Sequence, residues 1–185
     1  MNTELQRQLF HLLIGIVTIA MLLWLGRGYM VGAVFFVIIA GTLLINARML
    51  GVRIGPVQWF EERFEREDVL FPGWGSACYA AGTLIPLTFL LDTSQIAACI
   101  LVLALGDGMS TMVGRIGKSR LPYNRKKTLE GTAAFFMGSL AAFPFIGELA
   151  IPLALIAAIV ESMDLKLDDN LTVPIACTIF FLVVG

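Results

Sequence analysis

Long stretches without a charged side chain constrain this chain more than any other feature of its sequence. Residues 8–26, 28–47 and 69–91 contain no Lys, Arg, Asp or Glu. Each is long enough to cross a hydrocarbon core of ~30 Å as a helix of about 20 residues. Because backbone polar groups in lipid must be satisfied within the segment itself, we expect an all-α integral membrane protein.

The composition agrees with this class. Of the 185 residues, 58% are hydrophobic and 15% are charged, whereas soluble proteins have about 25% charged residues. We expect one membrane-embedded catalytic domain, 1–185. The formal net charge of −1 argues against a polyanion binder, so we expect no nucleic-acid partner. The first apolar run has no small-x-small cleavage site, and we expect it to be retained as a span.

The other apolar stretches predict further crossings. Residues 93–113 form a candidate span that Asp107 interrupts. Pro144 and Gly147 break the run 131–161, so we expect two short helices or a re-entrant hairpin there in place of one long helix. The seven predicted spans are about 9–26, 28–46, 72–91, 95–113, 131–146, 148–161 and 171–185.

The distribution of basic residues predicts an orientation. With the N-terminus in the cytoplasm, twelve of the thirteen Lys and Arg residues fall on the inner side, and only Arg27 lies outside. We therefore expect an active site that faces the cytoplasm, in the cell membrane or, in a eukaryote, the endoplasmic reticulum. Aromatic and charged residues alternate within the polar segment 46–72, which predicts an interfacial amphipathic helix. A solvated connector is the alternative.

A lone acid and the basic loop that follows it are the strongest functional signal. Asp107 lies in an apolar stretch, and an intramembrane acid marks a functional site by default. Gly114 and Gly117 would let backbone N–H groups approach an anion. Thr128 is a candidate N-cap, which would put Glu130 in the first turn of the next helix. The loop carries six basic residues: Arg115, Lys118, Arg120, Arg125, Lys126 and Lys127. We interpret it as a nucleotide phosphate site at the membrane surface; a topology signal alone is the alternative.

A second cluster, ESMDLKLDDN, precedes the last apolar run. Asp168, Asp169 and Asn170 offer clustered oxygen ligands, and Glu161 stands at the membrane edge. Hard cations such as Mg²⁺ take few carboxylates and complete their shell with phosphate and water. A magnesium site is one interpretation, and a solvated acidic loop is the other.

A third cluster lies at the entrance to the first span. Glu4, Arg7 and His11 follow the spacing i, i+3, i+7, which places them on one helical face. The ordinary pKa of a histidine lies close to working pH, so His11 is a candidate for proton transfer. A structural histidine is the alternative.

Taken together, these motifs match a known family. GDG…VGRIGK…KKTLEG with a distant DDNLTVP closely resembles the dolichol kinase and phytol kinase family of CTP-dependent polyprenol and lipid kinases, which are related to CTP:phosphatidate cytidylyltransferases. The opening ELQRQLFH resembles that family's E-x-x-RK-x-x-H element, with Gln8 in place of the usual Lys. This departure leaves Arg7 to supply any phosphate contact there alone. The resemblance covers essentially the whole chain and implies a CTP site built from the cytoplasmic loops.

The resemblance and the residue inventory together predict a Mg²⁺-dependent kinase. Phosphoryl transfer requires in-line positioning, neutralised phosphate charge and a base near the acceptor hydroxyl. We assign catalytic roles to Asp107 (the base), Lys127, Glu130 and His11. We assign nucleotide contacts to Arg7, Gly108, Gly114, Arg115, Gly117, Lys118, Lys126, Lys127, Gly131 and Asn170. We assign the metal to Asp107, Glu130, Glu161 and Asp169. The expected acceptor is an isoprenoid alcohol of the dolichol, phytol or geranylgeraniol type, or a diacylglycerol-like lipid.

Three other functional classes fit parts of the sequence, and one of them, a non-catalytic membrane scaffold, gives no role to the acid at Asp107. A CTP:lipid-phosphate cytidylyltransferase would use the same nucleotide and metal, but it would release labelled pyrophosphate from γ-labelled CTP. A transporter would also suit an intramembrane acid and broken helices, although the charged residues gather at one membrane face. The short last spans would require a thinned bilayer or a homo-oligomer.

Overall fold

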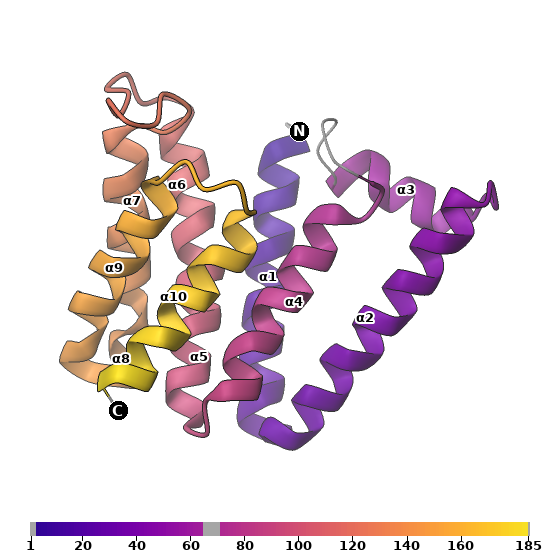
Figure 1. Cartoon of the computed structure of the whole chain (residues 1–185), viewed down its shortest axis with the longest axis horizontal. Helices are drawn as coiled ribbons and strands as arrows, with labels where there is room; N and C mark the ends of the chain where they lie inside the picture. The colour runs from indigo at the N-terminus through magenta and orange to yellow at the C-terminus, as the bar shows by residue number, and fades with distance from the viewer. Residues whose placement is uncertain (1–2, 65–70, 185) are drawn as a thin grey trace.

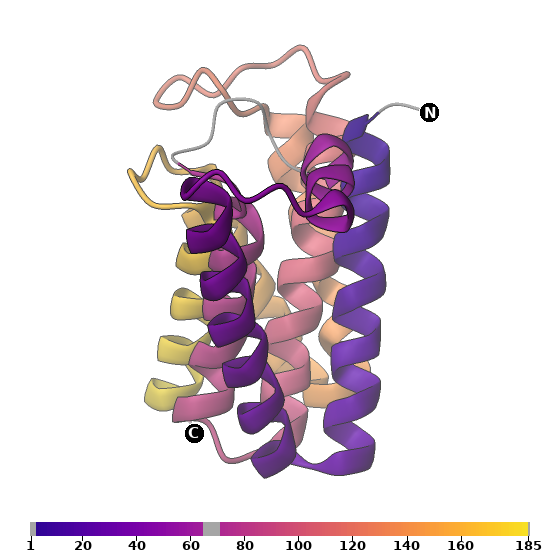
Figure 2. The same cartoon turned by 90° about the vertical axis from the view of Figure 1, so that its right-hand side faces the viewer.

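The structure, a computed structural model, describes residues 3–64 and 71–184, and within them it is all-α, as predicted (Figures 1 and 2). The first helices are α1 (Thr3–Leu25), α2 (Arg27–Met49), α3 (Gly55–Phe64), α4 (Trp74–Phe89) and α5 (Thr93–Leu101). A π-helical turn, Val102–Gly106, joins α5 to α6 (Asp107–Gly114). The chain continues through α7 (Leu129–Ser139), α8 (Phe143–Ile146), α9 (Ala150–Ser162) and α10 (Asp169–Val184).

The prediction of seven membrane crossings is wrong for the described residues. By length and composition, four segments could cross a membrane: Leu5–Leu25, Arg27–Met49, Thr93–Gly114 and Leu129–Ser162, the last of which reverses direction within its length. Helices α4 and α10 have 16 residues each, which corresponds to only about 24 Å at 1.5 Å per residue. All seven predicted segments do contain helix, but helix content alone does not provide the length of a span.

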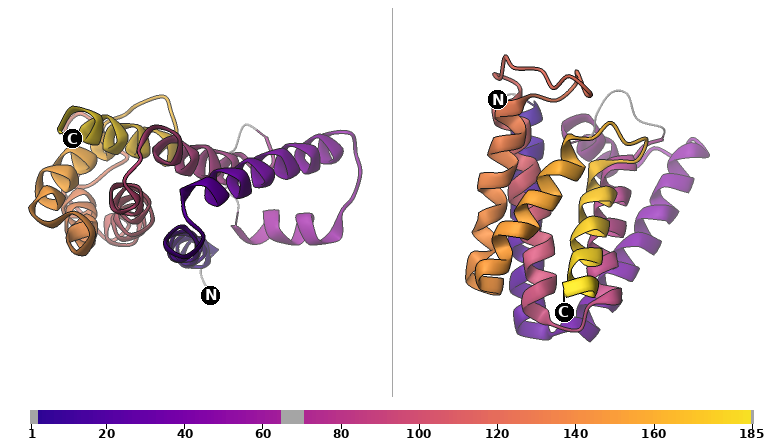
Figure 3. Two further views of the ribbon diagram at one scale, coloured as in Figure 1. Left: turned by 90° about the horizontal axis from the view of Figure 1, so that it is seen from below. Right: turned by 60° about the vertical axis from the view of Figure 1, so that its left-hand side comes forward.

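The predicted break within 131–161 is confirmed. Gly147 adopts a φ of 58° between α8 and α9, a conformation that favours glycine because it has no Cβ. Helices α7 and α9 pack against each other (Figure 3). The chain therefore runs away from the basic loop along α7, turns at α8, and returns along α9. This reversal brings Glu161 back to the end of the bundle that carries Lys127 (Figure 1).

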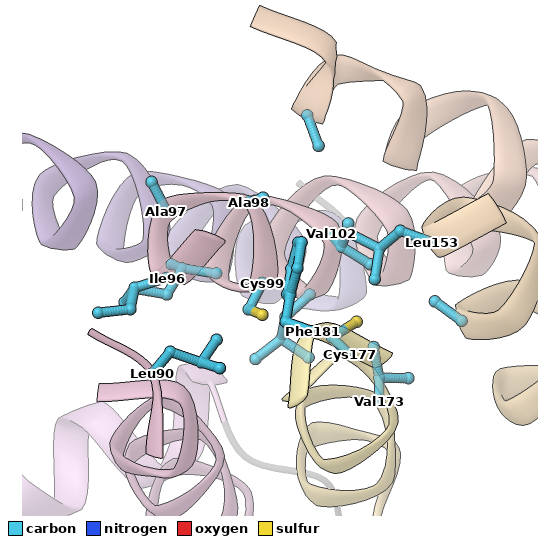
Figure 4. Close-up of a cluster of buried hydrophobic side chains, with 14 of the residues drawn as sticks. Leu90, Ile96, Ala97, Ala98, Cys99, Val102, Leu153, Val173, Cys177 and Phe181 are labelled. Atoms are coloured by element: carbon cyan, nitrogen blue, oxygen red, sulfur yellow. The ribbon is translucent and has the colours of Figure 1, made fainter. Parts of the chain in front are cut away.

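The core lies around α5 and the π-helical turn, which contact α1, α7 and α10. Helix α5 begins at Asp92, whose side chain accepts a hydrogen bond from the N–H of Ser94 at 2.7 Å, as an N-cap does. Val102 of the turn is fully buried, as are Leu153 of α9 and Val173 of α10 (Figure 4). A central apolar element thus holds the C-terminal helices in place around the site.

The polar connections gather at one end of the bundle. The loop 115–128, the connection 163–168, α3 and the start of α1 all lie there (Figures 1 and 2). Arg27 lies at the opposite end and donates to the carbonyl oxygens of Leu87 (2.7 Å) and Thr88 (2.9 Å). The structure therefore separates Arg27 from the basic loop, as the charge pattern predicted. The cytoplasmic assignment of the polar end stays a prediction.

The segment 46–72 contains the helix that was predicted there. Two rings of α3 lie against the Phe10 ring of α1: the ring centroid of Phe60 is 5.2 Å from it and the ring centroid of Phe64 is 4.6 Å from it. Arg63 stacks over the ring of Trp59 at 5.2 Å. The aromatic side of α3 thus packs on α1. The rest of the predicted helix, 65–70, lies outside the described residues, and the interfacial location stays a prediction.

Candidate active site

The basic loop forms a tight hairpin that is tied to α9. An isolated antiparallel bridge pairs Arg120 with Thr128, and the side chain of Asn124 caps the turn by accepting from the N–H of Lys126 at 3.1 Å. The same side chain is buried and donates to the carbonyl oxygen of Ser162 at 3.0 Å. The Tyr123 hydroxyl lies 2.9 Å from the Ser162 hydroxyl. The loop is therefore held over the end of α9, which places Lys127 beside Glu161.

The glycines of the motif allow α6 and α7 to approach closely. The Thr128 hydroxyl caps α7 by accepting from the N–H of Gly131 at 3.1 Å. A Cβ on Gly131 would come 3.0 Å from the Cα of Gly114. A Cβ on Gly117 would come 2.7 Å from the Thr128 hydroxyl and 2.9 Å from the carboxylate of Glu130. Packing thus disfavours a side chain at Gly117 and Gly131, whether or not their N–H groups also meet a phosphate, whereas a Cβ on Gly114 would lie at an ordinary contact distance of 3.4 Å from the Thr128 hydroxyl.

Four side chains from distant parts of the sequence meet where α6, α7, α9 and α10 converge. Lys127 Nζ donates to Glu161 Oε1 at 2.5 Å and to Asp169 Oδ2 at 2.7 Å. Ser110 donates its hydroxyl to the same Glu161 oxygen at 2.5 Å. Glu161 is fully buried, whereas the side chains of Lys127 and Asp169 are 25% and 30% exposed. The cluster therefore has one deep acid and two members open to a ligand.

Electrostatics keeps Lys127 charged. Burial lowers the pKa of this lysine, but the carboxylates of Asp169 and Glu161 outweigh that effect and raise the pKa above its ordinary value. A nearby opposite charge favours the ionised form of a group. Lys127 is therefore an ammonium at every working pH, and it offers a fixed positive charge in a partly desolvated position.

A polar cavity of about 580 Å³ opens beside this cluster. Its volume falls within the range of about 300–1,000 Å³ that is typical of small-molecule sites. Both loops contribute, as do the inner turns of α6 and α7. The charged residues that line it are Arg115, Arg120, Lys126, Lys127, Asp164, Asp168 and Asp169. Clustered cations beside carboxylates suit a phosphorylated ligand that carries a divalent cation.

Some predicted residues do not reach this cavity. The carboxylate of Glu130 accepts the backbone N–H groups of Lys118 and Ser119, both at 3.1 Å. Glu130 therefore clamps the start of the loop and is absent from the described lining of the cavity, as is Lys118. Asn170 is also absent from it; its N–H bonds to Asp168 Oδ1 at 3.0 Å, which starts α10.

The N-terminal predictions fall at a neighbouring position. Arg7 and Gln8 are buried on α1, and a Cβ on Gly108 would come 3.8 Å from the side-chain oxygen of Gln8. The ring of His11 meets that of Tyr79 edge to face, with centroids 4.9 Å apart. These residues pack around the start of α6, where Asp107 lies, and not in the polar cavity. The side chain of Glu4 lies outside the described part of the chain.

The predicted metal ligands are only partly brought together. Among the described residues, no three His, Cys, Asp or Glu side chains form a group that would hold a metal alone. Glu161 and Asp169 are adjacent, because both contact the same ammonium. The second oxygen of Glu161, Oε2, is buried and has no hydrogen-bond partner among the described residues. A divalent cation that also binds phosphate fits this oxygen-donor set, because Mg²⁺ requires few protein carboxylates.

Several site residues were not singled out from the sequence. Ser110 follows Asp107 by three residues in the same helix, and this spacing was a usable signal because it places both on one face. Ser162 contacts the tip of the loop and carried no signal of its own. Tyr79 and Thr83 lie in an apolar stretch, and no local sequence pattern indicates the contacts that bury their hydroxyls.

Comparison with known proteins gives a consistent set of relatives. The chain is 32% identical to an uncharacterized protein of Methanocaldococcus jannaschii, over 92% of this chain and 88% of that protein. It is 28% identical to a chloroplastic farnesol kinase of Arabidopsis thaliana and 33% identical to a probable chloroplastic phytol kinase of Oryza sativa. These two alignments cover 93% of this chain but 62% and 63% of the plant proteins, so the chain spans less than two thirds of their length. No protein-family model and no solved structure matches the chain.

Proposed function

We propose that the chain, which is similar to a plant farnesol kinase and a probable plant phytol kinase, belongs to the phytol kinase family and is a CTP-dependent kinase of isoprenoid alcohols. In this reaction the hydroxyl oxygen of the alcohol attacks the γ-phosphorus of CTP, the bond from that phosphorus to the β-phosphate oxygen breaks, and CDP leaves. The products are a prenyl phosphate, CDP and the proton of the alcohol. The choice of CTP as donor comes from the motif resemblance.

One observation carries this proposal: the contact of Lys127 with both Glu161 and Asp169. Thirty-four residues separate Lys127 from Glu161 along the chain, and the reversal at α8 brings them to the same end of the bundle. The cavity beside them has cations for a triphosphate and oxygens for its metal. A site for a nucleotide phosphate group is what this combination supports best.

Each part of the transfer has a candidate residue. Arg115, Arg120 and Lys126 line the cavity with exposed side chains and would hold the phosphate oxygens. Lys127 would neutralise charge that develops on the γ-phosphate. Asp107 lies three residues before Ser110 in α6 and would accept the proton of the alcohol.

The residues present also suit the Mg²⁺ that such a reaction uses. Asp169 and Glu161 would hold the ion together with phosphate oxygens. When bound, it would neutralise charge on the phosphates. Asp168 would orient the start of α10 through its bond to the N–H of Asn170, which keeps Asp169 aimed at the cavity.

The orientation is part of the proposal. The end of the bundle with the basic loop would face the cytoplasm, because the positive-inside bias and the supply of CTP both favour that side. The alcohol would reach the site from within the bilayer.

The test is a product assay with purified protein in lipid vesicles. We would supply Mg²⁺, each ribonucleoside triphosphate in turn, and farnesol, phytol, geranylgeraniol, dolichol or diacylglycerol. The expected result is a prenyl monophosphate that forms fastest with CTP. Lys126→Ala should slow the reaction, whereas Lys166→Ala, an exposed lysine outside the cavity lining, should not. Absence of phosphorylated alcohol with every donor would refute the proposal.

A further inference from the structure

A second hollow lies apart from the polar cavity and shares no lining residue with it. It consists of two adjoining pockets of about 410 and 330 Å³ between α1, α2, α3 and α4. The two pockets share Val37, Phe60, Ser76 and Ala80 among their lining residues, so they form one continuous hollow, here called the lateral groove. Helix α3 covers its outer end through Phe60, Pro56 and Val57.

The lateral groove is mostly apolar, and its two unpaired buried hydroxyls lie at its inner end. The hydroxyls of Tyr79 and Thr83 line the inner pocket and are buried, and neither has a hydrogen-bond partner among the described residues. An unpaired buried hydroxyl costs about 1–3 kcal/mol, and a ligand that brings a hydroxyl of its own removes this penalty. No Lys, Arg, Asp or Glu occurs among the described residues that line either pocket. The groove is therefore suited to an uncharged, long apolar molecule with one polar end.

The inner end of the groove lies next to the proposed base. A Cβ on Gly15 would come 3.2 Å from the Tyr79 hydroxyl and 2.5 Å from the Cβ of Ala104, which places this hydroxyl beside the turn that precedes Asp107. Ser110, one turn further along α6, lines the polar cavity. Asp107 thus stands one helical turn from the cavity, on the face of α6 that Ser110 shares.

We propose that the lateral groove binds the acceptor alcohol, with its hydroxyl between Tyr79 and Asp107 and its isoprenoid chain running past Ala80 toward Gly41. This inference rests on the proposed function and adds the location of the lipid and the determinant of its length. The inner pocket would hold the first isoprene units, and the outer pocket would hold those of longer alcohols. An anionic phospholipid would place its charge beside Asp107, which disfavours it as the resident ligand.

Two glycines of α2 provide a matched test. A Cβ at Gly41 or at Gly32 meets nothing within 4 Å, but only Gly41 lines the groove. Gly41→Leu would fill the outer pocket, whereas Gly32→Leu would add the same side chain to the exposed face of the same helix. Each variant would be compared with the unmodified protein in vesicles that contain a geranylgeraniol analogue with a photoreactive group on its last isoprene unit.

For the unmodified protein and for Gly32→Leu we expect cross-linked peptides from α2 and α4 around the outer pocket. For Gly41→Leu the yield of these peptides should fall by at least about tenfold. The ratio of geranylgeraniol to geraniol phosphorylation should fall by a similar factor, since one misfitting apolar group in a pocket changes discrimination by about 10–200-fold. Cross-links elsewhere, or equal effects of the two variants, would overturn the assignment. Cross-linking within the groove without phosphorylation of any alcohol would instead support a lipid site and refute the kinase.

Discussion

Replacing Lys127 by methionine removes the positive charge that faces a fully buried carboxylate. Glu161 is 0% exposed, and its charged partner is Lys127, at 2.5 Å. Removing one member of a buried ion pair destabilises proteins by about 3–5 kcal/mol, because the remaining charge is uncompensated. Since the Lys127 side chain is 25% exposed, water would screen part of this effect. We expect a loss near the lower end, about 3 kcal/mol.

The assay is equilibrium unfolding of the purified protein in detergent, as a double-mutant cycle. Glu161→Gln keeps an acceptor for the Ser110 hydroxyl and removes the negative charge. The double variant with Lys127→Met and Glu161→Gln should recover most of the stability that Lys127→Met loses. The coupling energy between the two positions should lie in the range of about 0.5–3 kcal/mol that is typical of interacting residues. Lys166→Met serves as the control for loss of an exposed lysine.

Two outcomes would refute this reasoning. In the first, Lys127→Met would be no less stable than Lys166→Met. In the second, Glu161→Gln would bring no recovery to the Lys127→Met protein. Either would mean that the carboxylate is neutral or hydrated in the folded protein. Because Lys127 also stabilises the fold, a loss of activity in a Lys127 variant must be compared with the loss of stability in the same variant.

Four further predictions follow from the geometry. Asp107→Asn should lower the turnover number by about 10²–10³-fold, as removal of a preorganised catalytic group does, while the thermal midpoint stays within a few degrees. Near-normal turnover would exclude Asp107 as the catalytic base. Gly82→Ala should destabilise the protein by about 1–3 kcal/mol in thermal unfolding, because its Cβ would overlap the carbonyl oxygen of Asn170 where α4 crosses α10; unchanged stability would contradict that close packing. Glu130→Ala should speed limited proteolysis of the loop 115–128, since the clamp on its N–H groups is lost; an unchanged cleavage rate would show that the loop holds itself. The raised pKa of Lys127 means that the stabilisation from this ammonium is complete below its unfolded-state pKa and is lost only as pH rises through the folded-state value. The stability difference from Lys127→Met should therefore not decrease as pH rises from about 6 to 9 in denaturant titrations. A difference that decreases as pH rises through this window would refute the assignment.

The sequence predicted the parts of the fold that depend on local pattern. Charge-free runs located the helices, and Pro144 with Gly147 predicted the reversal that forms α7 to α9. That reversal is also what made the meeting of Lys127 and Asp169 predictable, because it returns the chain to the starting side. The number of crossings was not predictable in this way, since a run of apolar residues does not reveal how much of it is helix.

Residue roles were predicted less well where one pattern serves two physical purposes. Gly114 and Gly131 fit a phosphate-binding loop, yet the structure uses them for the contact of α6 with α7. Glu130 has the character of a metal ligand, but it is engaged by the N–H groups of its own loop. The unpaired hydroxyl of Tyr79 gave no local signal, because only the packing of α1 against α4 buries it. Such outcomes depend on long-range geometry that spacing along a chain does not encode.

We propose above all that the protein transfers a phosphoryl group from CTP to an isoprenoid alcohol in the cavity beside Lys127. The most direct measurement is the fate of the label when purified protein in vesicles receives γ-labelled CTP, Mg²⁺ and farnesol. We expect label in farnesyl phosphate, none in pyrophosphate, and a loss of the labelled farnesyl phosphate in Asp107→Asn. Label in pyrophosphate together with a cytidylyl-lipid, or label that stays in CTP, would contradict it.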